Sequence, residues 1–280
     1  MPKIGAHVSA SGGIYKSITN AKIIGAECLQ IFGASPRSWL AKGHSKEDAD
    51  KFKRDLKDNK LGPVFLHAAY LVNLASSSAD NRQKSIQSLI DHLNIAESIG
   101  AEGLVFHVGS GKDAPKDKAV SFIIKGIKEV LSKVKGQSKL ILENDAGGGG
   151  KVGSLKEIGE IIRAVKSNRV GVCLDTAHSF ESGLIDEYTK DKVKKLFDEF
   201  DKEIGIKNLT VLHVNDSKTP TGSHSDRHAN IGEGLIGLQG FKNLASEKRI
   251  KNIPLVLEVP GFENMGPDKK NIDILKKLFK

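Results

Sequence analysis

Cysteine is scarce in this chain: only Cys28 and Cys173 occur among its 280 residues, and each lies inside an apolar run. Neither has a partner at Cys-x-x-Cys spacing, which excludes a zinc finger, and two isolated cysteines give no disulfide framework. We expect both to be buried structural thiols, because disulfides are rare inside cells.

Long apolar runs are also absent. No stretch reaches the roughly 18 apolar residues that a membrane helix needs, so the sequence predicts no membrane partner. The N-terminus passes directly into Lys3–His7 without a basic and then apolar leader, and we therefore expect an intracellular, cytoplasmic protein. With 39% hydrophobic and 28% charged residues, the composition is that of a globular protein rather than a disordered one.

Acidic residues are the minority among the charged ones. The chain has 43 Lys and Arg against 34 Asp and Glu, a formal net charge of +9. This excess favours a polyanionic partner and an association that weakens with salt. Alone it is a weak indication, because many lysine-rich proteins simply carry solvated lysines.

Short, mostly apolar, β-branched runs recur along the whole chain. They are Lys3–Val8, Glu27–Phe32, Val64–His67, Gly103–Val108, Leu140–Glu143, Val170–Asp175, Leu209–Val214 and Leu255–Glu258. Continuous apolarity is typical of parallel strands that are buried on both faces. Helical periodicity fills the intervals, as in Ser85–Ile99 and after the capping-box pattern Ser154-Leu-Lys-Glu157. Helical segments away from the strand ends are also expected to contain His44 and His92.

This alternation predicts one (β/α)8 TIM barrel over residues 1–280, because eight strands and their helices need about that length. An open doubly wound sheet is the alternative. The first strand is not followed by a glycine-rich fingerprint, which weakens that alternative. No linker or repeat divides the chain, so we expect a single domain.

The predicted strands three to eight each end in a side chain that can bind a metal. They are His67, His107, Glu143, Asp175, His213 and Glu258. In a (β/α)8 barrel these ends converge on the mouth where active sites form. Three carboxylates could not share a buried pocket without cations, because they would repel one another and lose their hydration.

Loops just beyond these strands add His178, Asp226 and His228. Imidazole and carboxylate ligands without a thiolate suit zinc or another first-row ion in an open catalytic site. Together these residues are too many for one tetrahedral ion. The sequence therefore predicts a cluster of two or three ions.

Longer strings around these residues resemble endonuclease IV, the zinc-dependent AP endonuclease family of base-excision repair. They are Gly5-Ala-His-Val-Ser-Ala10, Glu143-Asn144, Asp175-Thr-Ala-His178, His213-Val-Asn-Asp-Ser-Lys218, Asp226-Arg-His228 and Asn230-Ile-Gly-Glu-Gly234. The likeness extends from Lys3 to beyond Glu258. The chain departs from the family pattern at Asp145, the Gly147–Gly150 run, Ala177 and Val259.

The resemblance implies a trinuclear zinc site in each chain. One zinc would take His67, His107 and Glu143; a second would take Glu143, Asp175, His213 and Glu258; the third would take His178, Asp226 and His228. Glu143 would bridge the first two ions and serve as the catalytic carboxylate. Manganese or iron in part of the sites is the alternative metal content.

The activity implied by the resemblance is hydrolysis of the phosphodiester 5′ to an abasic site in double-stranded DNA. The products would be a 3′-hydroxyl and a 5′-deoxyribose phosphate, and blocked 3′ ends would be substrates too. Arg37 and Tyr70 would be wedges that enter the base stack, and Lys218 and Arg227 are expected to contact phosphates. His7, at the end of the first strand, is a candidate to contact a metal ligand or a phosphate. We expect a monomer.

Two other functions fit part of the pattern. A metal-dependent sugar isomerase or epimerase would share the strand-end ligands, but the pair Asp226 and His228 and the charge of +9 argue against it. A non-catalytic module that senses DNA damage would not need an open metal site. The number of metal ions per chain would separate the first alternative, and turnover on an abasic oligonucleotide would separate both.

Overall fold

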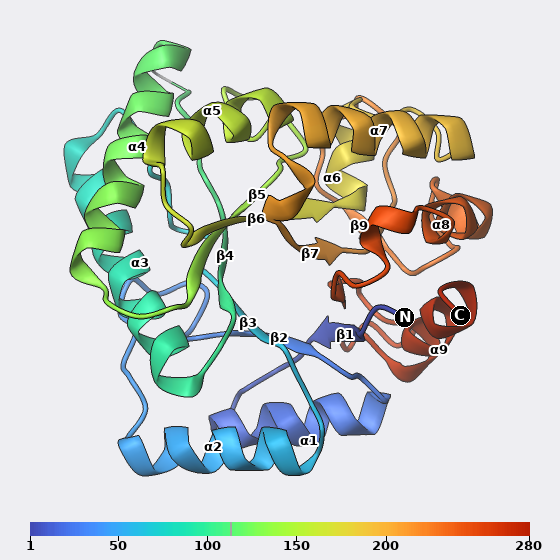
Figure 1. Cartoon of the computed structure of the whole chain (residues 1–280), viewed down its shortest axis with the longest axis horizontal. Helices are drawn as coiled ribbons and strands as arrows, with labels where there is room; N and C mark the ends of the chain where they lie inside the picture. The colour runs from blue at the N-terminus through green and yellow to red at the C-terminus, as the bar shows by residue number, and fades with distance from the viewer. Residues whose placement is uncertain (113) are drawn as a thin grey trace.

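Eight parallel strands close into a barrel in the computed structural model, which describes residues 1–112 and 114–280 (Figure 1). They are β1 (Ile4–His7), β2 (Leu29–Phe32), β3 (Val64–His67), β4 (Gly103–His107), β5 (Lys139–Glu143), β6 (Val170–Asp175), β7 (Leu209–His213) and β10 (Leu255–Leu257). The strands follow one another around the barrel in chain order, and β10 pairs with β1 to close it. The TIM barrel predicted from the recurring apolar runs is confirmed.

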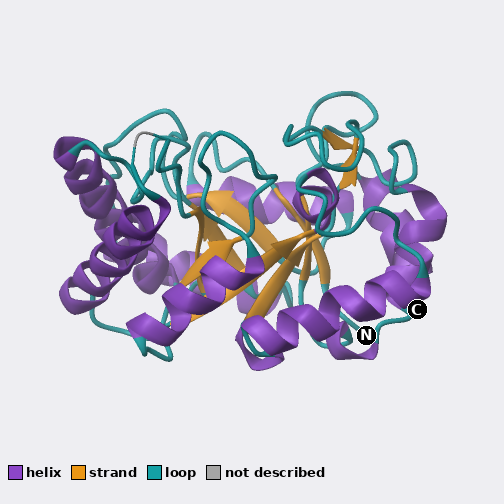
Figure 2. Ribbon diagram, turned by 90° about the horizontal axis from the view of Figure 1, so that it is seen from above, coloured by secondary structure: helices purple, strands orange, loops and turns teal. Residues whose placement is uncertain are grey.

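Helices cover the outside of the barrel, and long loops gather on one side of it (Figure 2). In chain order they are α1 (Ile14–Ile24), α2 (Lys46–Asp58), α3 (Ala79–Ile99), α4 (Lys116–Lys133), α5 (Leu155–Val165), α6 (Thr176–Glu181), α7 (Lys190–Glu203), α8 (Gly237–Ala245) and α9 (Lys269–Leu278), with 3-10 turns at Ile206–Asn208 and Lys248–Ile250. The predicted capping box opens α5: the Ser154 hydroxyl accepts from the N–H of Glu157, whose carboxylate accepts from the N–H of Ser154.

Two element ends differ from the prediction because hydrogen bonding, rather than apolar periodicity, decides them. Helix α3 begins at Ala79 instead of Ser85, since the hydroxyl of Ser78 caps a polar first turn. Strand β10 ends at Leu257, so that Glu258 lies just past the strand. The apolar pattern locates the elements, but it does not locate their ends.

The prediction for His44 was wrong. It lies in the loop before α2, because the next residue, Ser45, caps that helix. The imidazole of His44 lines a cavity of about 770 Å³ together with His7, at the side of the barrel mouth. His92 does lie in a helix, α3, where it is buried.

A layer of apolar side chains fills the middle of the barrel. Its members are Cys28, Phe65, Val105, Ile141, Cys173, Val211 and Val256, all fully buried. Gly5 takes the place of a side chain on β1, because a Cβ there would lie 1.8 Å from the carbonyl oxygen of Cys28. Both cysteines are free, and burial raises the pKa of each thiol to about 12. They are the buried structural thiols that the sequence predicted.

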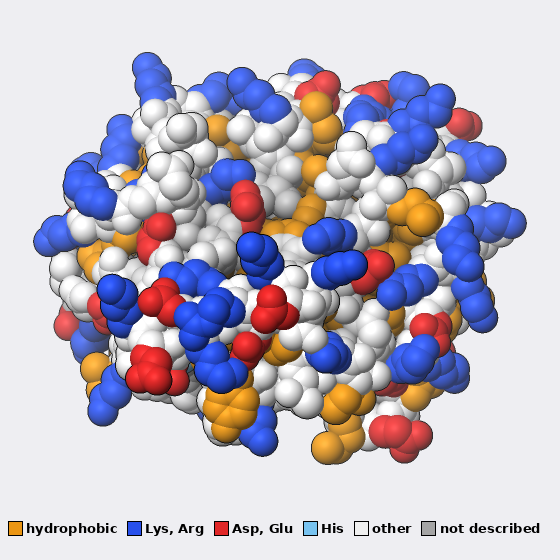
Figure 3. Space-filling model, turned by 60° about the horizontal axis from the view of Figure 1, so that its bottom comes forward, with side chains coloured by type: hydrophobic (Ala, Val, Ile, Leu, Met, Phe, Trp, Pro, Cys, Tyr) orange, Lys and Arg blue, Asp and Glu red, His pale blue; other side chains and the backbone are white. Residues whose placement is uncertain are grey.

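Basic side chains are spread over the surface. On the face seen in Figure 3, Lys and Arg lie across most of the area, with Asp and Glu among them. The net charge of +9 therefore does not by itself mark a binding face. Within the part of the chain that the structure describes, no helix is both long and apolar enough to cross a membrane.

Candidate metal centre

Above the apolar layer lies a ring of polar side chains, one from each barrel strand or from the residue just past it. This polar ring consists of His7, Gln30, His67, His107, Glu143, Asp175, His213 and Glu258. Successive strand residues point to opposite faces, so each of these side chains stands one layer above an apolar neighbour two residues earlier. Six of the eight are the strand-end ligands predicted from the sequence.

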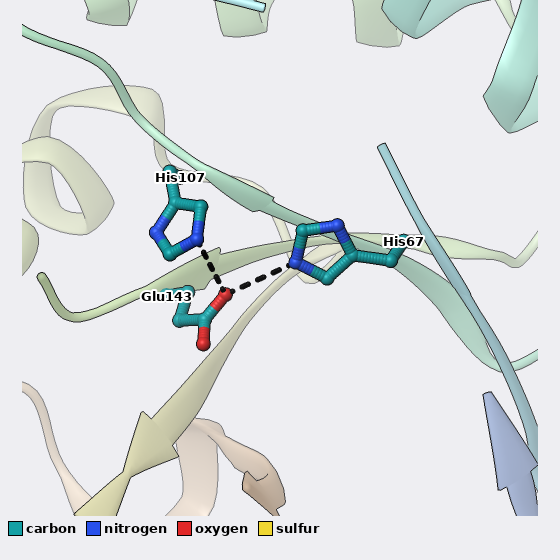
Figure 4. A group of neighbouring side chains, drawn as sticks. All are labelled: His67, His107 and Glu143. Carbon is teal, nitrogen blue, oxygen red and sulfur yellow. Dashed lines mark hydrogen bonds and ion pairs between the residues drawn. The ribbon is translucent and has the colours of Figure 1, made fainter. Parts of the chain in front are cut away.

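Glu143 is completely buried in the polar ring, and its two carboxylate oxygens face different histidines. Oε2 lies 3.3 Å from Nε2 of His67 and 3.6 Å from Nε2 of His107, and Figure 4 shows both rings turned toward it. Oε1 lies 2.8 Å from Nδ1 of His213. The carboxylate thus stands between two sets of donors, the position that a bridging ligand requires.

The ligand atoms gather in overlapping groups in which all lie within 4.8 Å of one another. One group holds His67, His107 and Glu143, and another holds Glu143, Asp175, His213 and Glu258. These are the same residues as the first two ligand sets that the family resemblance implies.

The residues of the third implied set meet at Asp226. Its Oδ2 lies 3.3 Å from Nε2 of His178, and its Oδ1 lies 3.4 Å from Nε2 of His228. Two overlapping groups contain these residues: Asp175 joins His178 and His228 in one, and Glu181 joins His178 and Asp226 in the other. Asp175 and Glu181 are therefore further carboxylates near this corner of the site.

Two of the three residues predicted to lie in loops lie in regular structure instead: His178 in the helix α6 and His228 in a short hairpin. Strand β9 (His228–Ala229) pairs with β8 (Asp216–Ser217) in antiparallel fashion. The carboxylate of Glu181, at the end of α6, accepts from the hydroxyl of Ser217 at 2.6 Å and from the N–H of Arg227 at 3.1 Å. These bonds fix the hairpin against the helix that carries His178.

Three of the histidines predicted as ligands place one ring nitrogen near the carboxylates and hold the other nitrogen on a fixed partner. Nδ1 of His67 donates to the carbonyl of Ala68 at 2.9 Å, and Nδ1 of His178 donates to the carbonyl of Asn144 at 3.0 Å. His213 is reversed, because its Nε2 lies 2.9 Å from Oε1 of Gln30. Such partners orient the ring and make the remaining nitrogen a better ligand.

Buried charged groups at the barrel mouth shift one another's pKa. Burial would raise the pKa of Glu143, but the imidazoles of His107 and His213 hold it well below its ordinary value. Burial would likewise lower the pKa of His178, but the carboxylates of Asp175 and Asp226 raise it well above its ordinary value. The buried carboxylates are thus stabilised by nearby positive charge. Protons on the imidazoles or bound metal cations can provide that charge.

The donor set fits metal ions in a second respect. Nε2 of His228, which faces Asp226, is buried and has no hydrogen-bond partner within residues 1–112 and 114–280. A buried polar atom without a partner is costly, and coordination to a cation removes that cost. Imidazoles and carboxylates without a thiolate are the ligands that zinc, manganese and iron accept.

The four predicted DNA contacts are exposed. Tyr70 is 68% exposed, and its ring meets the ring of Phe32 edge-on at 5.5 Å between centroids. The N–H of Tyr70 donates to the carbonyl of Pro36 at 3.1 Å, which ties its loop to that of Arg37. Tyr70 lines a cavity of about 440 Å³ with His67, His107, His178, Asp226, His228 and Glu258.

Lys218 and Arg227, the other two predicted contacts, lie opposite each other in the hairpin, directly after β8 and directly before β9. The N–H of Lys218 donates to the carbonyl of Arg227 at 2.8 Å, and both side chains are exposed. His7 belongs to the polar ring itself, with Nδ1 at 3.1 Å from Oε1 of Glu258. Its Nε2 is buried without a partner among the described residues, and its ring lines both mouth cavities.

The departures from the family pattern lie beside the ligands. Oδ2 of Asp145 is 3.8 Å from Nδ1 of His107. All glycines of Gly147–Gly150 have positive φ, a conformation that other residues rarely adopt. Ala177 and Val259 are buried next to ligands in the chain. These differences change the surroundings of the site and leave the ligand types in place.

Sequence reasoning missed Gln30 and Asn215. The Asn215 amide donates to Oδ2 of Asp175 at 2.7 Å, and its oxygen accepts from the N–H of Glu258 at 2.7 Å. A signal was present for Gln30, because a lone amide stands in the apolar run 27–32 at the position that ligands occupy on later strands. For Asn215, the signal was its place two residues after His213.

Known proteins resemble this chain over nearly its whole length. The model of the family described as "Xylose isomerase-like TIM barrel" matches residues 18–278. A protein named "Probable endonuclease 4" from Aquifex aeolicus is 38% identical over 281 residues, which cover 100% of this chain and 98% of the relative. The crystal structure of endonuclease IV from Thermus thermophilus has a TM-score of 0.86 at 31% identity and covers 99% of this chain and 98% of its own.

A sugar-converting enzyme shares the fold alone. The 3-keto-D-glucoside 4-epimerase of E. coli has a TM-score of 0.68 at 15% identity, covering 99% of both chains. At that identity the likeness carries no argument about substrate. The alternative of a sugar isomerase or epimerase therefore gains no support beyond a common barrel.

Proposed function

Because this chain belongs to the endonuclease IV family, within the xylose isomerase-like TIM barrels, we propose that its metal centre hydrolyses the phosphodiester 5′ to an abasic site in duplex DNA. The chain is accordingly a metal-dependent endodeoxyribonuclease of DNA repair. The proposed products are a 3′-hydroxyl and a 5′-deoxyribose phosphate. A DNA substrate implies that the protein acts inside the cell.

The position of Glu143 is the observation that carries the proposal. One of its oxygens faces His67 and His107, and the other faces His213. A carboxylate that lies between two sets of ligands calls for at least two metal ions. We propose three zinc ions per chain with the ligand sets that the resemblance implies, or manganese or iron in part of the sites.

The residues of the chain divide the work in this proposal. When bound, the ions supply Lewis-acid chemistry, because they neutralise phosphate charge and lower the pKa of water. Glu143 holds two ligand sets at a fixed spacing, while Asp175, His213 and Glu258 complete one of them. The hairpin brings Asp226 and His228 to His178, and Glu181 keeps the hairpin in place. His7 steadies Glu258 through its Nδ1.

Lesion recognition is proposed to depend on the exposed rim of the mouth. Tyr70 and Arg37 lie on loops joined by the hydrogen bond from Tyr70 to Pro36, so they can enter a base stack as one unit. Lys218 and Arg227 stand together on the hairpin, where they can contact phosphates. DNA with blocked 3′ ends is a second proposed substrate. We propose that the enzyme acts as a monomer.

A nicking assay with metal analysis tests the proposal. Purified protein is scanned for transition metals and then incubated with a duplex oligonucleotide that contains one abasic site, beside an intact duplex of the same sequence. We expect cleavage 5′ to the lesion only, and its loss after chelation with return on added zinc. Metal-loaded protein that leaves the abasic strand uncut would overturn the proposed function.

A further inference from the structure

Gln30 is the only amide in the polar ring, and neither the sequence motifs nor the ligand sets assign it a role. We propose that Gln30 is a positioning residue, which fixes the ring nitrogen that His213 offers to a metal ion and holds the carboxylate of Glu258 beside it. This inference rests on the proposed function, because it concerns how the metal centre is held together.

The contacts of Gln30 reach across the barrel. Its side chain starts from β2 and is completely buried. Oε1 lies 2.9 Å from Nε2 of His213, at the end of β7, and Nε2 lies 2.6 Å from Oε1 of Glu258, just past β10. Strands β1 and β10 lie between β2 and β7 in the barrel. One amide therefore connects two ligands of the same group from a strand that pairs with neither of theirs.

The orientation of the amide follows from Glu258. A carboxylate oxygen only accepts hydrogen bonds, so the atom of Gln30 that lies 2.6 Å away must be the amide nitrogen. With the amide turned over, two oxygens would face each other at that distance. The amide oxygen must then point at His213, and because it too only accepts, Nε2 of His213 must carry a proton.

This proton decides which nitrogen of His213 can bind a metal. A neutral imidazole has one protonated nitrogen and one lone pair, so a proton on Nε2 leaves the lone pair on Nδ1. Nδ1 is the atom that faces the carboxylates, 2.8 Å from Oε1 of Glu143 and 3.2 Å from Oε2 of Glu258. Gln30 thus directs the lone pair of His213 toward the metal position. Backbone carbonyls do the same for His67 and His178.

Glu258 is held on the same side by a second group. His7 places Nδ1 3.1 Å from Oε1 of Glu258, and the amide nitrogen of Gln30 lies 3.1 Å from that same Nδ1. Oε1 of Glu258 is therefore occupied by these neighbours. Oε2 is turned toward His213, where it is free to serve as a metal ligand.

Two substitutions separate the two tasks of Gln30. Gln30→Leu removes both contacts at similar size, which leaves Nε2 of His213 without a partner and Oε1 of Glu258 with His7 alone. Gln30→Glu keeps an acceptor for His213 but replaces the donor to Glu258 by a negative charge. Gln87→Leu serves as the control, because Gln87 is exposed on α3 and its amide bonds only with Asp91 among the described residues.

The full-length proteins are loaded with zinc, and two properties are measured besides folding. The first is the rate at which zinc passes to a chelator. The second, recorded before zinc is added, is the nitrogen-15 signals of the His213 ring, which report the nitrogen that carries the proton. We expect Gln30→Leu to release zinc about ten to a hundred times faster than wild type, the usual effect of losing a partner of a metal ligand, and to lose the exclusive protonation of Nε2. Gln30→Glu should release zinc faster but keep the proton on Nε2.

A role limited to packing predicts a different result. It would lower the unfolding temperature of Gln30→Leu and leave zinc release within about twofold of wild type with unchanged ring signals, and that result overturns the proposal. If Gln30→Leu does not fold, Gln30→Glu decides through the same zinc-release rate, with the same twofold limit. Wild-type protein that binds no zinc overturns the proposed function and this inference together, whereas wild-type-like variants overturn only this inference.

Discussion

Glu143 and His213 lie face to face inside the barrel, with 2.8 Å between Oε1 and Nδ1 and neither side chain exposed to solvent. The second oxygen of Glu143 is turned to His67 and His107 instead. One side chain therefore belongs to two ligand groups at once. Its charge should matter more for the chemistry than for the binding of DNA.

Glu143→Gln tests whether the charge of Glu143 serves the chemistry more than the binding of DNA. The change keeps the size of the side chain and removes the charge that joins two ligand groups, so we expect turnover to fall roughly a thousandfold or more, about 4 kcal/mol of transition-state stabilisation. Binding of abasic DNA should change far less. Single-turnover nicking rates and binding isotherms measure the two effects, with Glu160→Gln on the exposed face of α5 as the control. A rate above about a tenth of wild type would contradict the role given to Glu143.

The number of metal ions follows from the three proposed ligand sets. We expect about three transition-metal ions per chain in carefully purified protein, since these ligands exceed what one ion can coordinate. His228→Ala should lower that number by about one, because Asp226 and His178 alone then remain of the third set. Elemental analysis against protein concentration gives the result. One ion or none in wild type, or an unchanged count in the variant, would refute the trinuclear arrangement.

Lesion recognition is tested by replacing Arg37 and Tyr70 together with Ala. If these residues stabilise an unstacked duplex, binding to abasic DNA should weaken by a few kcal/mol, while binding to intact duplex should change much less. The slope of affinity against salt should stay the same, because phosphate contacts remain. Salt titrations with both DNAs on wild type and variant provide the comparison. Equal losses on the two DNAs would make these residues ordinary backbone contacts.

The close approach of Gly5 to Cys28 under the polar ring leads to a prediction about the free energy of unfolding. A Cβ on Gly5 would lie 1.8 Å from the carbonyl oxygen of Cys28, so Gly5→Ala forces β1 and β2 apart. We expect a loss of about 3 kcal/mol or more in the free energy of unfolding, at or above the upper range for overpacking a core. Gly43→Ala is the matched control, since a Cβ there meets nothing within 4 Å. Urea unfolding of both variants measures the difference, and equal stability would show that the strands can yield at Gly5.

The sequence predicted the barrel and the composition of the site for related reasons. Runs such as Val170–Asp175 are apolar throughout because both faces of a parallel strand are buried, and each run that ends in His, Asp or Glu has its polar residue at the barrel mouth. The position of Gln30 in its apolar run is a signal that it faces the mouth, but its role is not encoded there, because its partners His213 and Glu258 are distant in the sequence. Only the pairing of strands brings them together.

The hairpin of β8 and β9 shows a second limit. Its pairing joins Asp216 to Ala229, and the intervening loop has no apolar alternation that would indicate a strand. Glu181 holds this hairpin through side-chain bonds to Ser217 and to the N–H of Arg227, which no local pattern encodes. Contacts of this kind depend on the finished fold, and a single sequence does not reveal them.

The pairing of β1 with β10 has a consequence for how the protein folds during its synthesis. His7 stands near the beginning of the chain and Glu258 near the end of the barrel, and they meet only when Leu255 docks against Ile4. During translation, a ribosome has therefore made most of the polypeptide before the last carboxylate can reach its place. A chain that stops before Leu255 lacks both the strand that closes the barrel and Glu258, so its polar ring is incomplete. Closure of the barrel and completion of the polar ring are therefore one and the same folding event.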